Sequence, residues 1–352
     1  MKVKKRVLAH LTKCYCVAPL IYKGEKHYLA ASEKDFPCLL FDGQGNQAAT
    51  VWEHPGGTMS AVQIPGADGA FLATHRFYSP NDSREACIVM AVPGEDGWKI
   101  TRLALLPHVH RFDILDRDGV RYLIACTLCS GRDYKDDWSH PGKIYGCRLP
   151  GDLEHKDGTY RLPLVPIKEQ LLKNHGYSRW RRNKVECGLI TSEEGVFCVT
   201  PPEPGREEWG IERLLDVPVS DCVPVDFDGD GLDELLTLSP FHGDTVRIYH
   251  LDGGGAYRQV YEHPDKLPFA HGICGGFYRE TGQALVGCRQ GGRELLRFYW
   301  NPRTGGYESQ VLDRDAGSAN VLWDGDVILS ANRERDEVAW YEICEERYGE
   351  NV

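Results

Sequence analysis

The chain has 352 residues, 41% of them hydrophobic, and a formal net charge of −11. Its basic runs are no longer than Lys4-Lys5-Arg6, which argues against nucleic acid as a partner because phosphate binding needs clustered positive charge. No segment approaches the ~20 apolar residues of a membrane span, and the N-terminus lacks the apolar stretch of a signal peptide. The thirteen cysteines include a single CxxC, from Cys126 to Cys129, without a second pair. We therefore expect free thiols in a cytoplasmic protein that acts on neither nucleic acid nor membrane.

One sequence pattern recurs about seven times along the chain. A strand ends in small residues, a polar loop follows, and a second strand closes on aromatic or aliphatic residues. The copies begin at Leu29, Leu72, Ile124, Val196, Leu235, Leu285 and Ile328. A period of roughly 45–50 residues made of short strands and turns is typical of a β-propeller. The sequence predicts an all-β fold, a single seven-bladed β-propeller over residues 1–352, with six or eight blades as alternatives.

The expected blades cover residues 16–53, 57–106, 108–164, 186–217, 220–263, 268–312 and 318–342. The last is too short for four strands, so the alternating apolar residues of 6–11 predict an N-terminal strand that closes it. Residues 165–176 read as a helical insert, with Pro166 near its start and Gly176 at its end. Residues 129–142 form the longest mid-blade loop, either a lid or sugar-stacking wall or a solvated excursion. We expect both segments on the same face as the functional site.

Propeller topology sorts the loops between two faces. The loops that lead into the innermost strands and those between second and third strands share what we call the upper face. The loops between first and second strands lie on the lower face. Three of six loops leading into innermost strands carry histidine, namely His108 with His110, His175 and His271. Such histidines either bond backbone carbonyls or converge on the axis as a functional site.

The converging histidines suit two kinds of chemistry. His110, His175 and His271 are candidate ligands of a divalent metal such as Mn, Zn or Mg, with an open position for substrate. Without metal, the same side chains could act as general base and acid. His108 and His110 are expected to point to the same side, because they are two residues apart on a strand.

A second motif predicts a structural calcium site. Oxygen ligands recur at positions 1, 3, 5 and 9 of one loop, supplied by Asp226, Asp228, Asp230 and Glu234. This spacing suits Ca²⁺. The loop joins a first to a second strand and therefore belongs to the lower face. The alternative is a turn with solvated aspartates and no ion.

The segment DFDGDGLDELLTL resembles the FG-GAP or VCBS-type repeat of integrin-like propellers. Together with HVHRFD, PFAHGICGG and ANRERDEVAWYEI, it makes the chain similar to the propeller domain of aldos-2-ulose dehydratases. These lyases remove water from keto-sugars such as 1,5-anhydro-D-fructose. The fungal members carry cupin domains that this chain lacks, so the resemblance does not extend to an isomerase activity that depends on them.

The resemblance and the residues together predict a carbohydrate lyase that eliminates water, an alcohol or a glycosyl group from a small keto-sugar. His110, His175 and His271 would hold the metal and the carbonyl. The other roles are a base, assigned to His108 or His140, and hydroxyl-orienting groups, assigned to Tyr177 and Arg76, with Tyr177 or a second histidine as proton donor. The alternative is a non-catalytic propeller that binds a carbohydrate or a protein. A glycoside hydrolase has less support, because Asp221 is the one obvious carboxylate in the loops leading into innermost strands.

Overall fold

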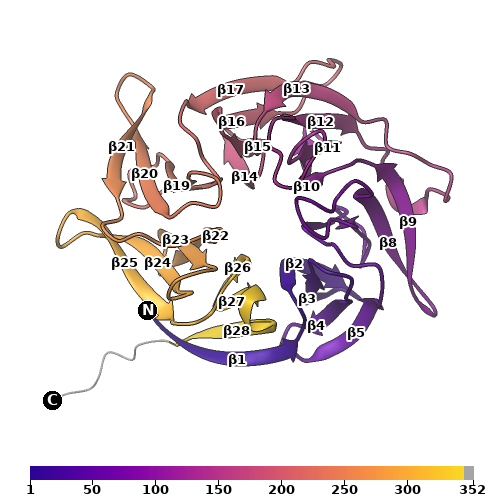
Figure 1. The fold of residues 1–352 in the computed structure, drawn as a ribbon, viewed down its shortest axis with the longest axis horizontal. Helices are drawn as coiled ribbons and strands as arrows, with labels where there is room; N and C mark the ends of the chain where they lie inside the picture. Colours follow the sequence, from indigo (N-terminus) through magenta and orange to yellow (C-terminus); the bar gives the residue numbers. More distant parts are fainter. Residues whose placement is uncertain (345–352) are drawn as a thin grey trace.

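A computed structural model describes residues 1–344 and shows seven four-stranded antiparallel sheets set radially around a central axis (Figure 1). The predicted all-β, seven-bladed propeller is confirmed.

The first six blades each contain four strands that follow one another in the chain. Blade 1 contains β2 (Cys14–Tyr22), β3 (Glu25–Ser32), β4 (Cys38–Asp42) and β5 (Gln47–Trp52), and blade 2 contains β6 (Ala61–Gln63), β7 (Phe71–His75), β8 (Cys87–Gly94) and β9 (Gly97–Leu105). Blades 3 and 4 are β10 (Val109–Arg117), β11 (Val120–Thr127), β12 (Gly142–Arg148) and β13 (Val165–Leu171), then β14 (Tyr177–Arg182), β15 (Val185–Ser192), β16 (Gly195–Thr200) and β17 (Gly210–Leu215). Blades 5 and 6 are β18 (Asp221–Val225), β19 (Glu234–Ser239), β20 (Thr245–Leu251) and β21 (Tyr257–Glu262), then β22 (Ala270–Tyr278), β23 (Thr281–Cys288), β24 (Leu295–Asn301) and β25 (Gly306–Asp313).

The last blade joins the two ends of the chain. It contains β26 (Asn320–Asp324), β27 (Val327–Asn332) and β28 (Glu337–Cys344), with β1 (Lys2–His10) added antiparallel to β28 as the outermost strand. Lys5 of β1 also forms ion pairs with Asp313 and Glu337. The expected closure by an N-terminal strand is therefore confirmed, and β1 pairs with the outer edge of β28, which would otherwise be exposed.

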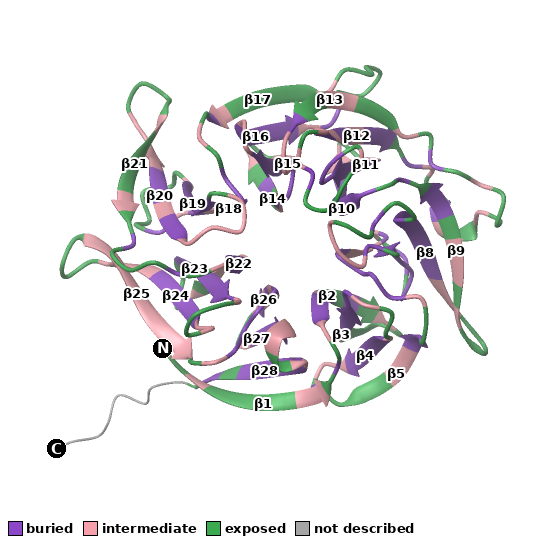
Figure 2. Ribbon diagram, in the orientation of Figure 1, coloured by how far each residue is buried: buried purple, intermediate pink, exposed green. Residues whose placement is uncertain are grey.

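The core lies between neighbouring blades. The second and third strands of each blade are largely buried, the innermost strands are buried only in part, and the outermost strands face solvent (Figure 2). In β19, all six residues are buried, whereas the outermost strand β1 contains no buried residue. A middle strand is packed on both faces, and this explains its continuous apolar run in the sequence.

The expected helix at 165–176 is wrong. Residues Val165–Leu171 form β13, which pairs with β12 as the fourth strand of blade 3. The segment has good helix-forming residues, but the unpaired edge of β12 offers it a ladder of hydrogen bonds, and such tertiary pairing overrides intrinsic propensity. Blade 3 consequently extends to Leu171, and blade 4 begins at Tyr177 rather than at residue 186.

Helical structure in residues 1–344 is limited to two short 3₁₀ turns, η1 (Leu153–His155) and η2 (Arg333–Arg335). Within this part of the chain, no helix has the length and apolar character needed to cross a membrane.

Candidate functional site

The same local geometry brings the chain to the axis in successive blades. In each blade one residue near the start of the innermost strand occupies what we call the axial position. In six blades, the residue two places before it has a left-handed backbone; these residues are Lys13, Gly57, His108, Lys173, Phe269 and Gly317. The residues at the axial position, in blade order, are Tyr15, Met59, His110, His175, Ser220, His271 and Ala319. Tyr15, His110 and His271 fall where the ladder to the second strand shifts register. Such bulges re-aim a side chain, here toward the axis.

Three axial histidines are anchored in the same way. The Nδ1 atom of His110 lies 3.1 Å from the carbonyl of His175, and Nδ1 of His175 lies 3.1 Å from the carbonyl of Ser220. Nδ1 of His271 lies 2.7 Å from the carbonyl of Ala319. Each acceptor is the backbone of the axial residue in the next blade. Because a carbonyl can only accept, Nδ1 carries the hydrogen and Nε2 keeps a free lone pair.

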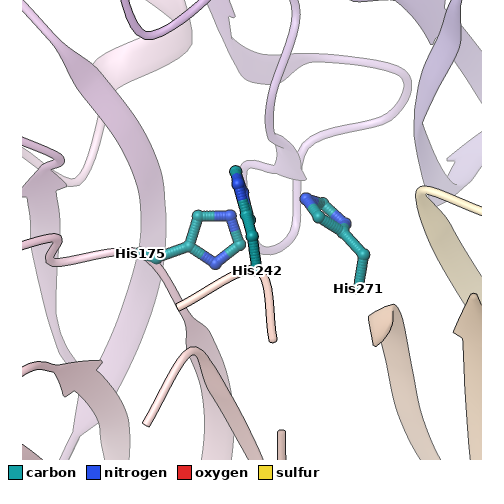
Figure 3. A group of neighbouring side chains, drawn as sticks. All are labelled: His175, His242 and His271. Atoms are coloured by element: carbon teal, nitrogen blue, oxygen red, sulfur yellow. The ribbon is translucent and has the colours of Figure 1, made fainter. Parts of the chain in front are cut away.

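The free nitrogens converge on the axis (Figure 3). One ring nitrogen from each of His175, His242 and His271 lies within 4.8 Å of the other two. Nε2 of His175 is buried and has no hydrogen-bond partner among the described residues. The His110 ring lies beside that of His175, with ring centroids 4.5 Å apart and the planes tilted by 33°. The Tyr15 hydroxyl lies 3.3 Å from Nε2 of both His110 and His271, and can donate to one of them at a time.

Burial keeps these imidazoles neutral. His110, His175 and His271 are each 3% exposed or less. Desolvation lowers the pKa of His175 to about 3 and that of His242 to about 2, and it places the pKa of His110 and of His271 well below the usual value. Neutral imidazoles with free Nε2 atoms are the form that ligates a metal or accepts a proton.

The sequence placed His110, His175 and His271 in one metal site, and the structure brings all three to the axis. It adds His242, from the loop between β19 and β20, to the compact group and leaves His110 beside Tyr15. All donors in the compact group are imidazole nitrogens. This donor set suits Zn, Mn, Fe, Co or Ni, whereas Mg²⁺ prefers oxygen and fits poorly.

A second layer, not predicted from the sequence, lies one residue further along the innermost strands. The Arg111 guanidinium donates to the carbonyl of Met59 at 2.7 Å and to Oδ1 of Asn320 at 3.2 Å. Burial raises the pKa of the Asp221 carboxyl to about 7, against the lowering effect of Arg111. The Asp221 carboxyl closely approaches Gly176, where a Cβ atom would lie 2.5 Å from its Oδ1. A carboxyl whose pKa is raised to about 7 and a cation thus follow the axial residues on the innermost strands.

A wide cavity of the lower face extends toward this layer. It measures about 1000 Å³ and includes Trp180, Trp323 and the Asp113–Arg179 ion pair in its walls. A smaller space of about 170 Å³, lined partly by Arg111 and Asn320, adjoins its inner end. Over the histidines on the upper face, Phe241, His242 and Phe269 pack together with ring centroids 3.8 and 4.4 Å apart. Aromatic rings therefore pack against the axial group on its upper-face side, and the wide cavity opens on the lower face.

Four residues that were predicted to be catalytic form their hydrogen bonds or ion pairs away from the axial histidines. His108 does not point with His110, because its left-handed φ of 62° takes it out of the strand, and its Nδ1 lies 2.7 Å from Ser83 Oγ. His140 Nε2 contacts Asp133 at 3.0 Å within its own loop. The exposed Arg76 pairs with Glu85, and the Tyr177 hydroxyl donates to Asp113 on the cavity wall.

The predicted calcium loop lies between β18 and β19. Carboxylate oxygens of Asp226, Asp228 and Asp230 lie within 4.8 Å of one another, while Glu234 groups instead with Asp228 and His250. Glu234 accepts hydrogen bonds from the Phe227 amide at 2.9 Å and the Tyr307 hydroxyl at 2.8 Å, and burial raises its pKa to about 7. The three aspartates therefore form the compact oxygen cluster, and Glu234 faces the blade interior.

Calcium is expected to stabilise the wild-type fold through this loop. Neutralising three adjacent carboxylates favours the folded state, and saturation at about 100 times Kd corresponds to about 2.7 kcal/mol. Thermal unfolding with and without Ca²⁺ measures the effect. Asp228→Asn should abolish the rise in Tm, and Asp252→Asn, in a different exposed turn, should keep it. Equal rises in both variants would show that the aspartates do not bind the ion.

Comparisons with known proteins identify the fold and no family. No protein-family model matches the chain, and no curated protein matches it in sequence. Among solved structures, the β-propeller domain of Cps50 (Swd1) from Myceliophteria thermophila matches with a TM-score of 0.58 and 11% identity, over 97% of this chain and 100% of that one. The periplasmic gluconolactonase PpgL of Pseudomonas aeruginosa matches with a TM-score of 0.58 and 14% identity, over 92% of this chain and 90% of that one. At these identities the likeness establishes a shared propeller fold.

Proposed function

We propose that the chain is a carbohydrate lyase that eliminates water, an alcohol or a glycosyl group from a keto-sugar at the axial histidines. The observation that carries the proposal is the set of neutral imidazoles from separate blades, fixed through Nδ1 and free at Nε2. The motifs around residues 108–113, 268–276 and 331–343, which resemble aldos-2-ulose dehydratases, support the same activity. A gluconolactonase shares the fold, which supports an enzymatic role on a sugar derivative.

His175, His242 and His271 would hold a divalent transition metal. The orphaned Nε2 of His175 supports this assignment, because a buried acceptor without a partner is costly. When bound, the metal supplies a Lewis acid that polarises the substrate carbonyl.

Proton transfer is assigned to His110 and Tyr15. The carbon next to a carbonyl must lose a proton, and the neutral Nε2 of His110 accepts it. The electron pair forms an enolate, and then a carbon–carbon double bond as the carbon–oxygen bond to the leaving group breaks. Tyr15, 3.3 Å from His110 Nε2, protonates the departing oxygen and regains its proton from the His110 imidazolium. Atoms balance without any further reactant.

Arg111 and the lower cavity complete the site. A guanidinium has five N–H donors, and the bonds to Met59 and Asn320 use two of them. Arg111 can therefore also stabilise negative charge on the enolate oxygen. The cavity walls combine tryptophans with polar groups, as pockets for sugars and other small polar molecules do. We assign the lower face as the substrate route.

All thirteen cysteines are free thiols. This supports a reducing compartment such as the cytoplasm.

The proposal is tested by incubating the purified protein with 1,5-anhydro-D-fructose and with 3-keto-glycosides. The expected product is an unsaturated ketone, detected by its ultraviolet absorbance and by NMR. EDTA should abolish its formation, and a transition metal should restore it. Saturable sugar binding without turnover under every metal would favour the non-catalytic alternative. If neither binding nor turnover occurs, the lyase proposal is wrong.

A further inference from the structure

A second cavity lies on the upper face, between the mid-blade loops of blades 2 and 3. It measures about 270 Å³, and its lining residues are Asn81, Arg84, His108, Arg132, Asp133, Tyr134 and Lys135. Trp138 and Phe241, whose ring centroids are 5.0 Å apart, separate it from the axial His175. The cavity therefore stands apart from the proposed elimination site.

Arg132 is the central feature of this cavity. It is 5% exposed, its guanidinium lies 3.9 Å over the Trp138 ring, and its Nη1 donates to Asn81 Oδ1 at 2.9 Å. Its Nε and Nη2 atoms are buried without a partner among the described residues. A buried cation is unfavourable unless an anion and hydrogen-bond acceptors compensate it. In residues 1–344, Asn81 is the acceptor for one of its nitrogens, two others have no acceptor, and no carboxylate lies within ion-pair distance.

Two further cations face the same space. Arg84 donates to the Arg132 carbonyl at 2.6 Å, and Lys135 follows on the blade 3 loop. The nearby carboxylates bond other donors: Asp133 contacts His140, and Asp136 accepts from the Asn81 amide. Burial, Arg132 and Arg84 lower the pKa of His108 to about 4, in keeping with a positive potential in the cavity.

We propose that this cavity binds a phosphate group, held by Arg132, Arg84 and Lys135. Guanidinium groups match tetrahedral oxyanions through paired hydrogen bonds, and a lysine adds a point charge. The cavity lining contains three cationic side chains and one carboxylate, Asp133, which is bonded to His140. This balance of charge favours a ligand with two negative charges over a ligand with a single carboxylate group. The volume is below that of pockets for drug-sized ligands and well above that of one water. It therefore suits inorganic phosphate or the phosphate end of a larger molecule.

Isothermal titration with inorganic phosphate, at constant ionic strength and on the full chain as purified, tests the proposal. Wild type and His271→Ala should bind phosphate saturably with the same Kd, which separates this site from the axial histidines. Arg132→Met should abolish binding. The exposed variants Arg84→Met and Lys135→Met, which do not disturb the core, should each weaken it about tenfold or more. Lys184→Met, at an exposed turn in blade 4, is the matched charge control.

Three results would overturn the assignment. The first is no saturable phosphate binding by wild type. The second is an equal Kd for wild type, Arg84→Met and Lys135→Met. The third is that acetate binds as tightly as phosphate, because the cavity would then not distinguish phosphate from a carboxylate ligand.

Discussion

Replacing His271 with alanine is expected to remove the bound transition metal and to lower kcat/KM for keto-sugar elimination by more than the roughly 10–100-fold loss typical of outer-shell changes. His271 contributes a ring nitrogen to the compact group with His175 and His242. Its Nε2 also faces the Tyr15 hydroxyl. The substitution thus removes a ligand and one partner of the proton donor. Elemental analysis and the elimination assay, on the same preparation, measure both effects.

His75→Ala is the matched control for this prediction. His75 is 2% exposed, packs on Trp52 with ring centroids 4.5 Å apart, and has a pKa lowered to about 4 by burial. Its replacement removes a buried neutral imidazole of the same size outside the compact group. This variant should keep metal and turnover, as should Asp228→Ala in the calcium loop. Full metal content and activity in His271→Ala would contradict the assigned centre.

Asp221→Asn is expected to change how stability depends on pH. Burial raises the pKa of this carboxyl from 3.8 to about 7 in the folded protein. Below pH 4 it is protonated in both folded and unfolded chains. Between pH 4 and 7 only the unfolded chain loses the proton, so the free energy of unfolding falls, and the loss is complete above pH 7. Asparagine does not titrate and removes this loss.

The free energy of unfolding of Asp221→Asn, relative to wild type, should therefore rise between pH 4 and pH 8 by on the order of 4 kcal/mol. Denaturant unfolding across this range, with EDTA present throughout, measures it. Asp118→Asn changes a turn residue whose left-handed φ of 53° asparagine tolerates, and serves as control. A pH-independent difference between Asp221→Asn and wild type would show that the carboxyl ionises in the folded protein as it does in water.

The blade repeat was readable from sequence because each blade contains the same physical unit. Mainly apolar runs such as 235–239 mark strands buried between blades, and the polar segments between them mark turns. The alternation over 6–11 was enough to predict the closing strand β1. The prediction of a helix that includes residues 165–171 was wrong. These residues favour a helix, but hydrogen bonding to the neighbouring edge of β12 holds them in a strand.

The site was predictable in part. Its histidines stood out by position, but their geometry depends on features that spacing does not encode. A left-handed residue at His108 and a bulge at His110 break the simple alternation of a strand. Tyr15 lies two places after the left-handed Lys13, as His110 lies two places after His108, but the sequence does not show the left-handed backbone. Arg111 and Asp221 are the residues that directly follow the axial positions of blades 3 and 5. His242 belongs to a mid-blade loop, and only the folded structure shows that it joins the axial group.

The most direct test of the account is product analysis of 1,5-anhydro-D-fructose incubated with metal-loaded wild-type protein. The account predicts conversion to a product lighter by one water, with a carbon–carbon double bond conjugated to the carbonyl, and no conversion by His271→Ala. Recovery of the unchanged sugar, and of unchanged 3-keto-glycosides, from protein with a full metal complement would contradict keto-sugar elimination at the axial histidines.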